Sequence, residues 1–151
     1  MDSVYDDILA AVQRKIRSLA LDGLRDEQVR IGDHGLFSRG MPEKGITLVD
    51  DVERHGQGTM NEDEIGYPVV LFLQVGQGGS EHSTRLRYWR ESIYNDFNMR
   101  REPLTTYLDR ADVTPLRCNV NFGNGRLSQF WRDRWSANHL AVWCWIRRVR
   151  T

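Results

Sequence analysis

The chain has 151 residues and a mass of 17.6 kDa, a length that suits one domain of ordinary size. Apolar residues make up 40% and charged residues 28%, which is typical of a globular protein rather than a disordered or fibrous one. No apolar run approaches the ~20 residues of a membrane span, and acidic residues stand where a signal peptide would carry lysines. We therefore expect a single soluble domain over residues 1–151, with no membrane contact.

The formal net charge is zero, but the charges are unevenly distributed. Residues 1–80 carry 8 basic and 14 acidic side chains, whereas residues 81–151 carry 13 basic and 7 acidic ones. Of the 21 basic residues, 19 are arginine. One interpretation is codon bias in a GC-rich genome. The other is a protein whose acidic and basic halves meet in neighbouring copies, since arginine suits carboxylate pairing and packed interfaces. Zero net charge argues against a general nucleic-acid binder.

The first half predicts one helix and three strands. A helix is expected over Ser3–Leu21, because apolar residues recur at helical spacing and Ser3 with Asp6 resembles a capping box. Short strands are expected at Gln28–Ile31 and Ile46–Val52, separated by a glycine-rich loop over 32–45. The polar stretch Glu53–Gly66 is predicted to be a second long loop.

Tyr67–Val75 is nearly continuous in apolar residues, which predicts a central strand covered on both faces. A second helix is expected over Ser83–Phe97 and a brief helical turn over Pro103–Tyr107. Alternation around Cys118–Phe122 and over Ala137–Val149 predicts two further strands. The order predicts an α+β fold: a mainly antiparallel sheet of four to five strands with two helices packed on it.

Catalytic and metal-binding patterns are weak in this sequence. Cys118 and Cys144 are expected to be two reduced core thiols, or else a bridge between neighbouring strands. Together with His139 they form only a loose zinc pattern. The sequence contains no GxSxG motif and no P-loop lysine after Gly76. We therefore predict no catalytic residue, no metal site and no cofactor.

A magnesium-dependent nuclease is the enzymatic alternative. Asp50, Asp51 and Glu53 end a predicted strand, and the acidic run Asn61–Glu64 follows closely. No lysine lies between Glu53 and Val75 to complete the arrangement that many such nucleases use. A solvated acidic loop is the preferred interpretation.

All five tryptophans fall in the basic half, and the segment Trp131-Arg-Asp-Arg-Trp135 places two rings beside two guanidinium groups. Tryptophan and arginine are enriched at interface hot spots, although they also stack on single-stranded bases. We expect Trp89 and one of Trp143 and Trp145 to lie in the core. The residues predicted to contact other subunits or partners are Arg90, Trp131, Arg132, Trp135 and Arg147.

The assembled layout resembles the tail terminator (tail completion) and neck proteins of long-tailed bacteriophages. The resemblance is carried by the helix Tyr5–Leu21, the strand opening Asp63-Glu-Ile-Gly-Tyr-Pro-Val69, the helix segment Tyr88-Trp-Arg-Glu-Ser-Ile93 and the final strand Ser136–Val149. It covers nearly the whole chain through loose motifs.

The resemblance implies a virion structural protein, found in the host cytoplasm during assembly. Such proteins form a homo-oligomeric ring, usually a hexamer, that caps the tail tube and joins it to the head. The implied partners are the tail tube protein and a head-completion or connector protein, and DNA would pass through without specific binding. A head–tail adaptor or another assembly module remains an alternative, as do the nuclease and a nucleic-acid-binding module.

Overall fold

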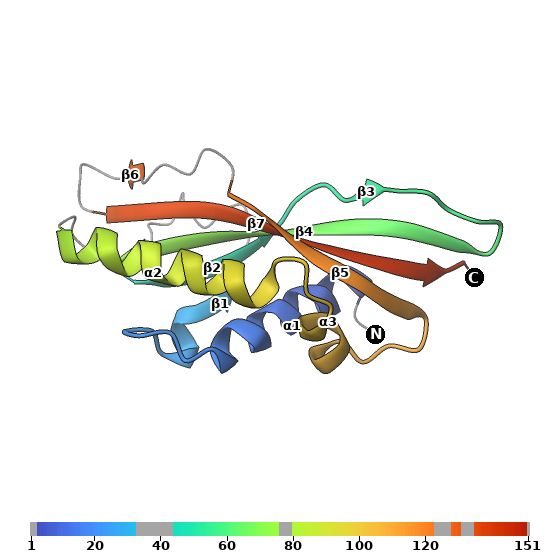
Figure 1. Ribbon diagram of the computed structural model, residues 1–151, viewed down its shortest axis with the longest axis horizontal. Coiled ribbons are helices and arrows are strands. Elements are labelled where there is room, and N and C mark those ends of the chain that lie inside the picture. The colour runs from blue at the N-terminus through green and yellow to red at the C-terminus, as the bar shows by residue number, and fades with distance from the viewer. Residues whose placement is uncertain (1–2, 33–43, 76–79, 123–127, 131–134, 151) are drawn as a thin grey trace.

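The computed structural model describes the backbone of residues 3–32, 44–75, 80–122, 128–130 and 135–150. Side chains are described over the same ranges except at residues 80–83, 128–130 and 135–138. The molecule is elongated, and a twisted sheet runs along its length with helices on one side (Figure 1).

The described residues form three α-helices, one 3₁₀ turn and seven strands. In chain order they are α1 (Val4–Ser18), η1 (Asp26–Gln28), β1 (Val29–Ile31), β2 (Gly45–Asp50), β3 (Arg54–His55), β4 (Glu62–Val75), α2 (Ser80–Phe97), α3 (Glu102–Tyr107), β5 (Val113–Asn121), β6 (Ser128–Phe130) and β7 (Trp135–Val149). The α+β class predicted from the sequence is confirmed.

The first helix begins at Val4, one residue after the predicted start, and Ser3 caps it as predicted. Ser3 is the N-cap: its hydroxyl accepts a hydrogen bond from the Asp6 N–H at 3.0 Å, and the Asp6 carboxylate accepts one from the Ser3 N–H at 3.4 Å. The first of these bonds occupies an N–H that a helix end leaves without an intrahelical partner. The helix ends at Ser18 rather than Leu21, and Ala20 turns the chain with a φ of 48°. The apolar stripe is buried as predicted, at Ile8, Leu9, Val12 and Ile16.

The sheet is built around the two longest strands, β4 and β7, which have 14 and 15 residues. They pair antiparallel from Glu62 opposite Val149 to Val75 opposite Ser136. The main strand order is β1-β2-β4-β7-β5, with β3 paired to β4 and β6 paired to β7. Only the β1–β2 pair is parallel among the described strands. The predicted central strand therefore lies at the centre.

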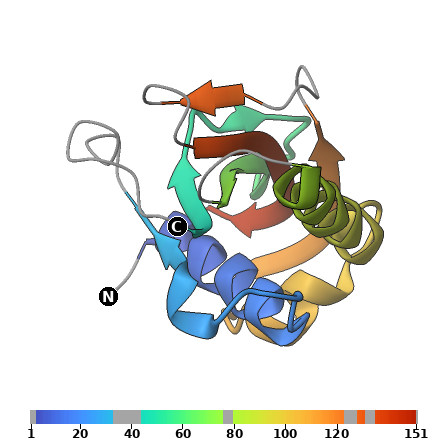
Figure 2. The ribbon, with the colours of Figure 1, turned by 90° about the vertical axis from the view of Figure 1, so that its left-hand side faces the viewer.

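The helices form a layer on one side of this sheet (Figure 2). Helix α1 packs on β1, β2 and β4, while α2 packs on β4, β7 and β5. The face of α2 that the spacing predicts is fully buried: Leu86, Trp89, Ile93 and Phe97. The indole N–H of Trp89 donates to the Asp22 carbonyl at 2.9 Å, which gives the buried ring its one polar partner. Trp89 is a core residue, as predicted.

Three details of the predicted fold need correction. The described sheet has seven strands instead of four or five, because the short strands β3 and β6 attach beside the main path. Three α-helices pack on the sheet instead of two, since Glu102–Tyr107 forms a helix of its own. The stretch Glu53–Gly66 is not one long loop. It contains β3 and the first five residues of β4, Glu62–Gly66, which extend the predicted strand at its start.

Backbone groups on both outer strands of the main path are hydrogen-bonded outside the sheet. On β5, the Cys118 N–H donates to the Arg100 carbonyl and the Cys118 carbonyl accepts from Met99. On β1, the Val29 carbonyl accepts from the side chains of Gln13 and Arg17. These bonds occupy groups that would otherwise pair with a strand from another molecule. Association by extension of the sheet is therefore disfavoured at these positions.

Cys118 and Cys144 are directly opposite each other on β5 and β7, and both are free and fully buried. Since the backbone bonds of Cys118 point away from β7, this is a non-hydrogen-bonded pair, in which side chains approach most closely. The contact with Cys118, together with burial, raises the pKa of the Cys144 thiol. The prediction of two reduced core thiols agrees with the structure.

We expect both thiols to be inert in the folded protein, because they are buried and the raised pKa disfavours the reactive thiolate. The native protein should show less than one reactive thiol with Ellman's reagent over minutes, and two after unfolding in urea. Rapid reaction of either thiol in the native state would contradict this burial.

The acidic and basic halves of the sequence meet within one chain. Carboxylates of β4 pair with arginines of the second half: Glu62 with Arg147 at 3.4 Å, Asp63 with Arg150 at 2.5 Å and Glu64 with Arg117 at 3.9 Å. Asp7 of α1 also pairs with Arg110 at 3.0 Å. Part of the charge asymmetry is thus used to hold β4 and α1 against later elements of the same chain.

Two further ion pairs, Arg110 with Asp112 and Lys15 with Glu102, predict a pH dependence of stability. Hydrogen bonds from Arg110 lower the pKa of Asp112, and a hydrogen bond from Lys15 lowers that of Glu102. A carboxyl group with a depressed folded pKa stabilises the fold above its unfolded pKa, and this stabilisation is lost as the pH falls through the folded value. We expect the melting temperature to fall below about pH 4, with a smaller dependence in Asp112→Asn.

Thermal melts of both proteins between pH 3 and 7 check this prediction. The matched control is Asp109→Asn, which removes an exposed carboxylate that forms no ion pair in the described part of the chain. Identical pH profiles for the wild type and Asp112→Asn would show that the ion pair between Arg110 and Asp112 does not contribute to the pH dependence of the melting temperature.

Candidate interaction surface

The described residues contain no group of three or more histidine, cysteine, aspartate or glutamate side chains placed to hold a metal ion. Asp51, the residue singled out for the nuclease alternative, uses Oδ1 to accept a hydrogen bond from the Val52 N–H at 2.8 Å. Within the same part of the chain, no helix is long and apolar enough to cross a membrane. The features that stand out instead are three surfaces rich in charged or aromatic side chains.

The first surface lies on the sheet face opposite the helices. Along β7, residues 140, 142, 144 and 146 point into the core, so Trp143 and Trp145 point outward. Their rings stack with centroids 6.3 Å apart. Arg54 of β3 lies over Trp143 at 5.0 Å, and Arg117 of β5 lies over Trp145 at 5.4 Å. We call these four residues the aromatic strip.

The aromatic strip depends on what stands opposite each ring on β4. Trp145 is paired with Gly66 and Trp143 with Pro68. A Cβ atom at Gly66 would lie 2.9 Å from three atoms of the Trp145 ring, so only glycine lets the indole lie flat on the strand. The two tryptophans are half-buried, and neither belongs to the core. The expectation that one of them is a core residue is therefore wrong.

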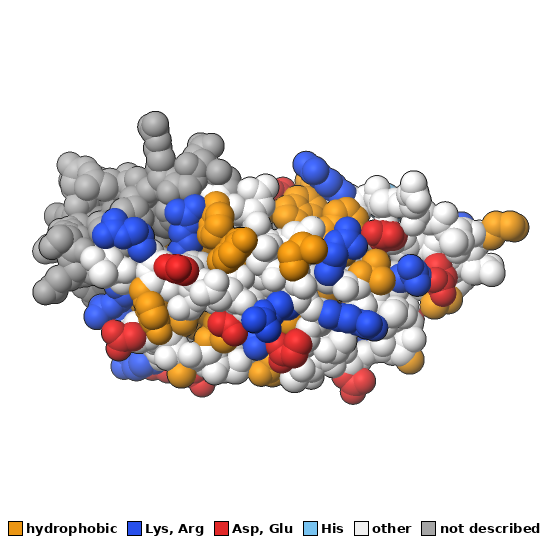
Figure 3. Space-filling view, in the orientation of Figure 1, with side chains coloured by type: hydrophobic (Ala, Val, Ile, Leu, Met, Phe, Trp, Pro, Cys, Tyr) orange, Lys and Arg blue, Asp and Glu red, His pale blue; other side chains and the backbone are white. Residues whose placement is uncertain are grey.

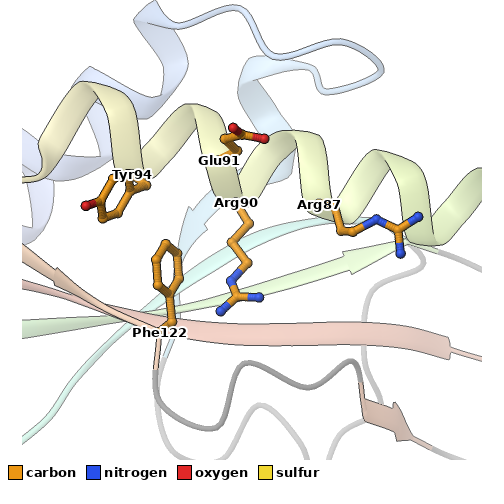
Figure 4. Close-up of a pocket in the computed structure, with 5 residues that line it drawn as sticks. All are labelled: Arg87, Arg90, Glu91, Tyr94 and Phe122. Carbon is orange, nitrogen blue, oxygen red and sulfur yellow. The ribbon is translucent and has the colours of Figure 1, made fainter.

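The second surface is a pocket between α2 and the end of β5 (Figure 4). It has a volume of about 400 Å³ and is lined by Arg87, Arg90, Glu91, Tyr94 and Phe122, which we call the arginine pocket. The Arg90 guanidinium lies 4.1 Å from the Phe122 ring centroid, and Tyr94 stacks on the same ring at 5.2 Å. Hydrophobic and basic side chains gather beside one another on this face of the molecule (Figure 3).

The arginine pocket arises from helical spacing. Arg87, Arg90 and Tyr94 follow one another at intervals of three and four residues, so they lie on one flank of α2 beside its buried stripe. Arg87 and Arg90 extend toward the same side, whereas Glu91 points away from the Phe122 ring (Figure 4). A guanidinium group held flat on an aromatic ring keeps its charge and its N–H groups in a fixed orientation.

The third surface is the segment Asp50–Glu53 after β2, which we call the acidic ridge. The Tyr5 hydroxyl accepts a hydrogen bond from the Asp51 N–H at 2.9 Å and donates to the Pro68 carbonyl. Burial raises the pKa of Tyr5 well above its usual range, and the charges of the acidic ridge raise it further. The backbone is thus anchored, while Asp51, Val52 and Glu53 remain exposed, Val52 by 76%.

The structure describes the side chains of two of the five residues predicted to contact partners. Arg90 lies in the arginine pocket. Arg147 is exposed on β7, where its guanidinium is 3.4 Å from Glu62 of the same chain. Trp135 is the first residue of β7, and its side chain lies outside the described residues, as do Trp131 and Arg132 altogether. Of these five residues, the described side chains are therefore Arg90 and Arg147, which lie on two different elements, α2 and β7.

Sequence reasoning missed the partners of the aromatic residues. Arg54, Arg117 and Phe122 come from three separate segments, and no periodicity in the sequence links them to Trp143, Trp145 or Arg90. The one available signal was the alternation along the final strand, which places both tryptophans on the same face.

No protein-family model matches this chain, and no curated protein matches its sequence.

We expect Gly66→Ala to lower the free energy of unfolding by about 1–3 kcal/mol, because the new methyl group displaces the Trp145 ring. Urea unfolding followed by tryptophan fluorescence measures the change. Gly56→Ala is the matched control: its Cβ would lie 3.4 Å from Glu64 and 3.5 Å from Trp145, which is ordinary contact. Equal stability of the two variants would show that the ring does not depend on Gly66.

Proposed function

We propose that this chain is a structural protein of a bacteriophage particle, a tail-terminator-like subunit. In this role, about six copies form a ring that caps the tail tube and joins it to the head. The tail tube protein and a head-completion or connector protein are its partners, and DNA passes through the ring without specific binding. The subunit acts in the virion neck and in the host cytoplasm during assembly, without catalysis or a cofactor.

The observation that carries this proposal is the extended β4–β7 pair. Its two strands are far longer than the five to six residues of an ordinary strand, and the pair continues beyond the helical layer (Figure 1). Residues 51–61 at this end are all exposed, with Met60 exposed by 90%. Such a projection adds little to the core of a single copy, so it fits a subunit that reaches its neighbours.

Two further features support the same role. The order of elements follows the layout that the sequence resemblance implies, a small α+β domain with one helix at the start and one in the middle. The aromatic strip and the arginine pocket expose tryptophan, tyrosine and arginine, the residue types that dominate interface hot spots. Since the backbone groups of Cys118 on β5 and of Val29 on β1 are occupied, contacts between copies at these positions would be made by side chains.

The test is the oligomeric state of the purified protein, alone and with tail tubes. We expect negative-stain electron microscopy to show closed rings of about six copies, and mass photometry to give a mass of about six times 17.6 kDa. Rings seated on tube ends, with tube growth arrested, would be the functional readout. A chain that stays monomeric in the presence of tubes and leaves their length unchanged would contradict the proposal.

A further inference from the structure

We propose that the acidic ridge of one copy binds in the arginine pocket of the next copy. This inference rests on the proposed function, because it names the contact by which copies of this chain associate laterally. It follows from where the two surfaces lie on the sheet and from their chemistry.

The two surfaces lie at opposite edges of the sheet, and one row of paired residues connects the start of the acidic ridge with the last residues of β5. Asp50 of β2 is opposite Val69 of β4, Val69 is opposite Val142 of β7, and Val142 is opposite Val120 of β5. One row across the sheet therefore begins at the acidic ridge and ends two residues before Phe122. Since β1 pairs no further than Leu48, β2 is the edge strand at this level among the described residues.

Within one copy the two surfaces cannot meet. Strands are spaced by about 4.8 Å, so three intervals from β2 to β5 separate the acidic ridge from the arginine pocket by roughly 14 Å across the packed sheet. A second copy placed beside the first, and shifted along the strand direction, brings its acidic ridge to the arginine pocket of the first. The contact joins two different surfaces, so it repeats from copy to copy and closes a ring if each step adds a suitable rotation.

The chemistry of the two surfaces is complementary. The acidic ridge reads Asp-Asp-Val-Glu, with an exposed apolar side chain between carboxylates. The arginine pocket offers two guanidinium groups around the aromatic rings of Tyr94 and Phe122. Arginine and carboxylate groups form strong charge-assisted hydrogen bonds. The apolar side chain of Val52 can pack against the rings of Tyr94 and Phe122.

Both surfaces are also held in place before contact. Tyr5 anchors the backbone at Asp51, and the Tyr5 ring itself packs edge-on against Tyr67 at 4.9 Å. On the other side, Phe122 lies between Arg90 and Tyr94. Little conformational freedom is lost on binding when the interacting groups are already fixed, which favours a specific contact over a loose electrostatic one.

Charge reversal tests the contact. In the first variant, Arg87→Glu and Arg90→Glu reverse the arginine pocket; in the second, Asp51→Arg and Glu53→Arg reverse the acidic ridge. We expect each variant alone to associate at least about 100-fold more weakly than the wild type, as judged by sedimentation and mass photometry. The matched control is Arg14→Glu with Arg101→Glu, which reverses one exposed arginine on α1 and one at the N-cap of α3 and should assemble like the wild type.

Mixing the two reversed variants is the decisive step. The acidic ridge of the first fits the intact arginine pocket of the second, and the basic ridge of the second fits the reversed pocket of the first. An equimolar mixture should therefore restore assembly with the two chains alternating. Circular dichroism and thermal melts establish that each variant is folded before mixing.

The outcomes separate this inference from the proposed function. Assembly of either reversed variant at the wild-type level overturns the inference but leaves the ring intact. A mixture that stays unassembled overturns it as well, and so does a wild-type chain that remains monomeric at every concentration tested. Rescue by mixing, into open filaments that do not cap tail tubes, supports the inference and contradicts the proposed function.

Discussion

The pairing of β4 with β7 along their whole length is the constraint on which the rest of the structure depends. Fourteen residue pairs hold the two strands together, and every other strand except β1 attaches directly to one of them. Their inward residues form the buried surface on which α1 and α2 pack. Val69 opposite Val142 and Leu71 opposite Leu140 are two such pairs. Because side chains alternate along a strand, the same pairing also fixes which residues face outward.

The outward face becomes chemically distinctive because of this alternation. Trp143 and Trp145 cannot enter the core while their neighbours Val142 and Cys144 do, so they need cover on the other side of the sheet. Arg54 and Arg117, from strands on either side of the β4–β7 pair, supply part of that cover. The same face is fully buried at Thr47 and Gln74, whereas His139 on it is exposed.

Charge plays two roles in this chain. Glu62, Asp63 and Glu64 are neutralised by arginines that the fold brings beside them, which lets an acidic strand end pair with a basic one. Arg87, Asp51 and Glu53 form no such ion pair among the described residues, and they lie near the two edges of the sheet. Folding therefore pairs only part of the unevenly distributed charge within the chain. The other charged side chains lie where a neighbouring molecule can contact them.

The sequence by itself determined the elements whose signals are local. The capping residues and the apolar stripe predicted α1, continuous apolar residues predicted the central strand, and the spacing of Leu86, Trp89, Ile93 and Phe97 predicted the buried face of α2. These signals depend on neighbours within a few residues, and the periods of helix and strand are fixed by backbone geometry.

Only the tertiary structure decided what lies beside what. No local pattern places Arg54 over Trp143, Arg90 over Phe122, or the Tyr5 hydroxyl on the backbone of Asp51. These contacts join residues from 30 to 90 positions apart, and they follow from strand order and register, which a single sequence leaves open. The extra strand β3 has the same origin: two residues pair because β4 passes beside them, with no propensity of their own to form a strand.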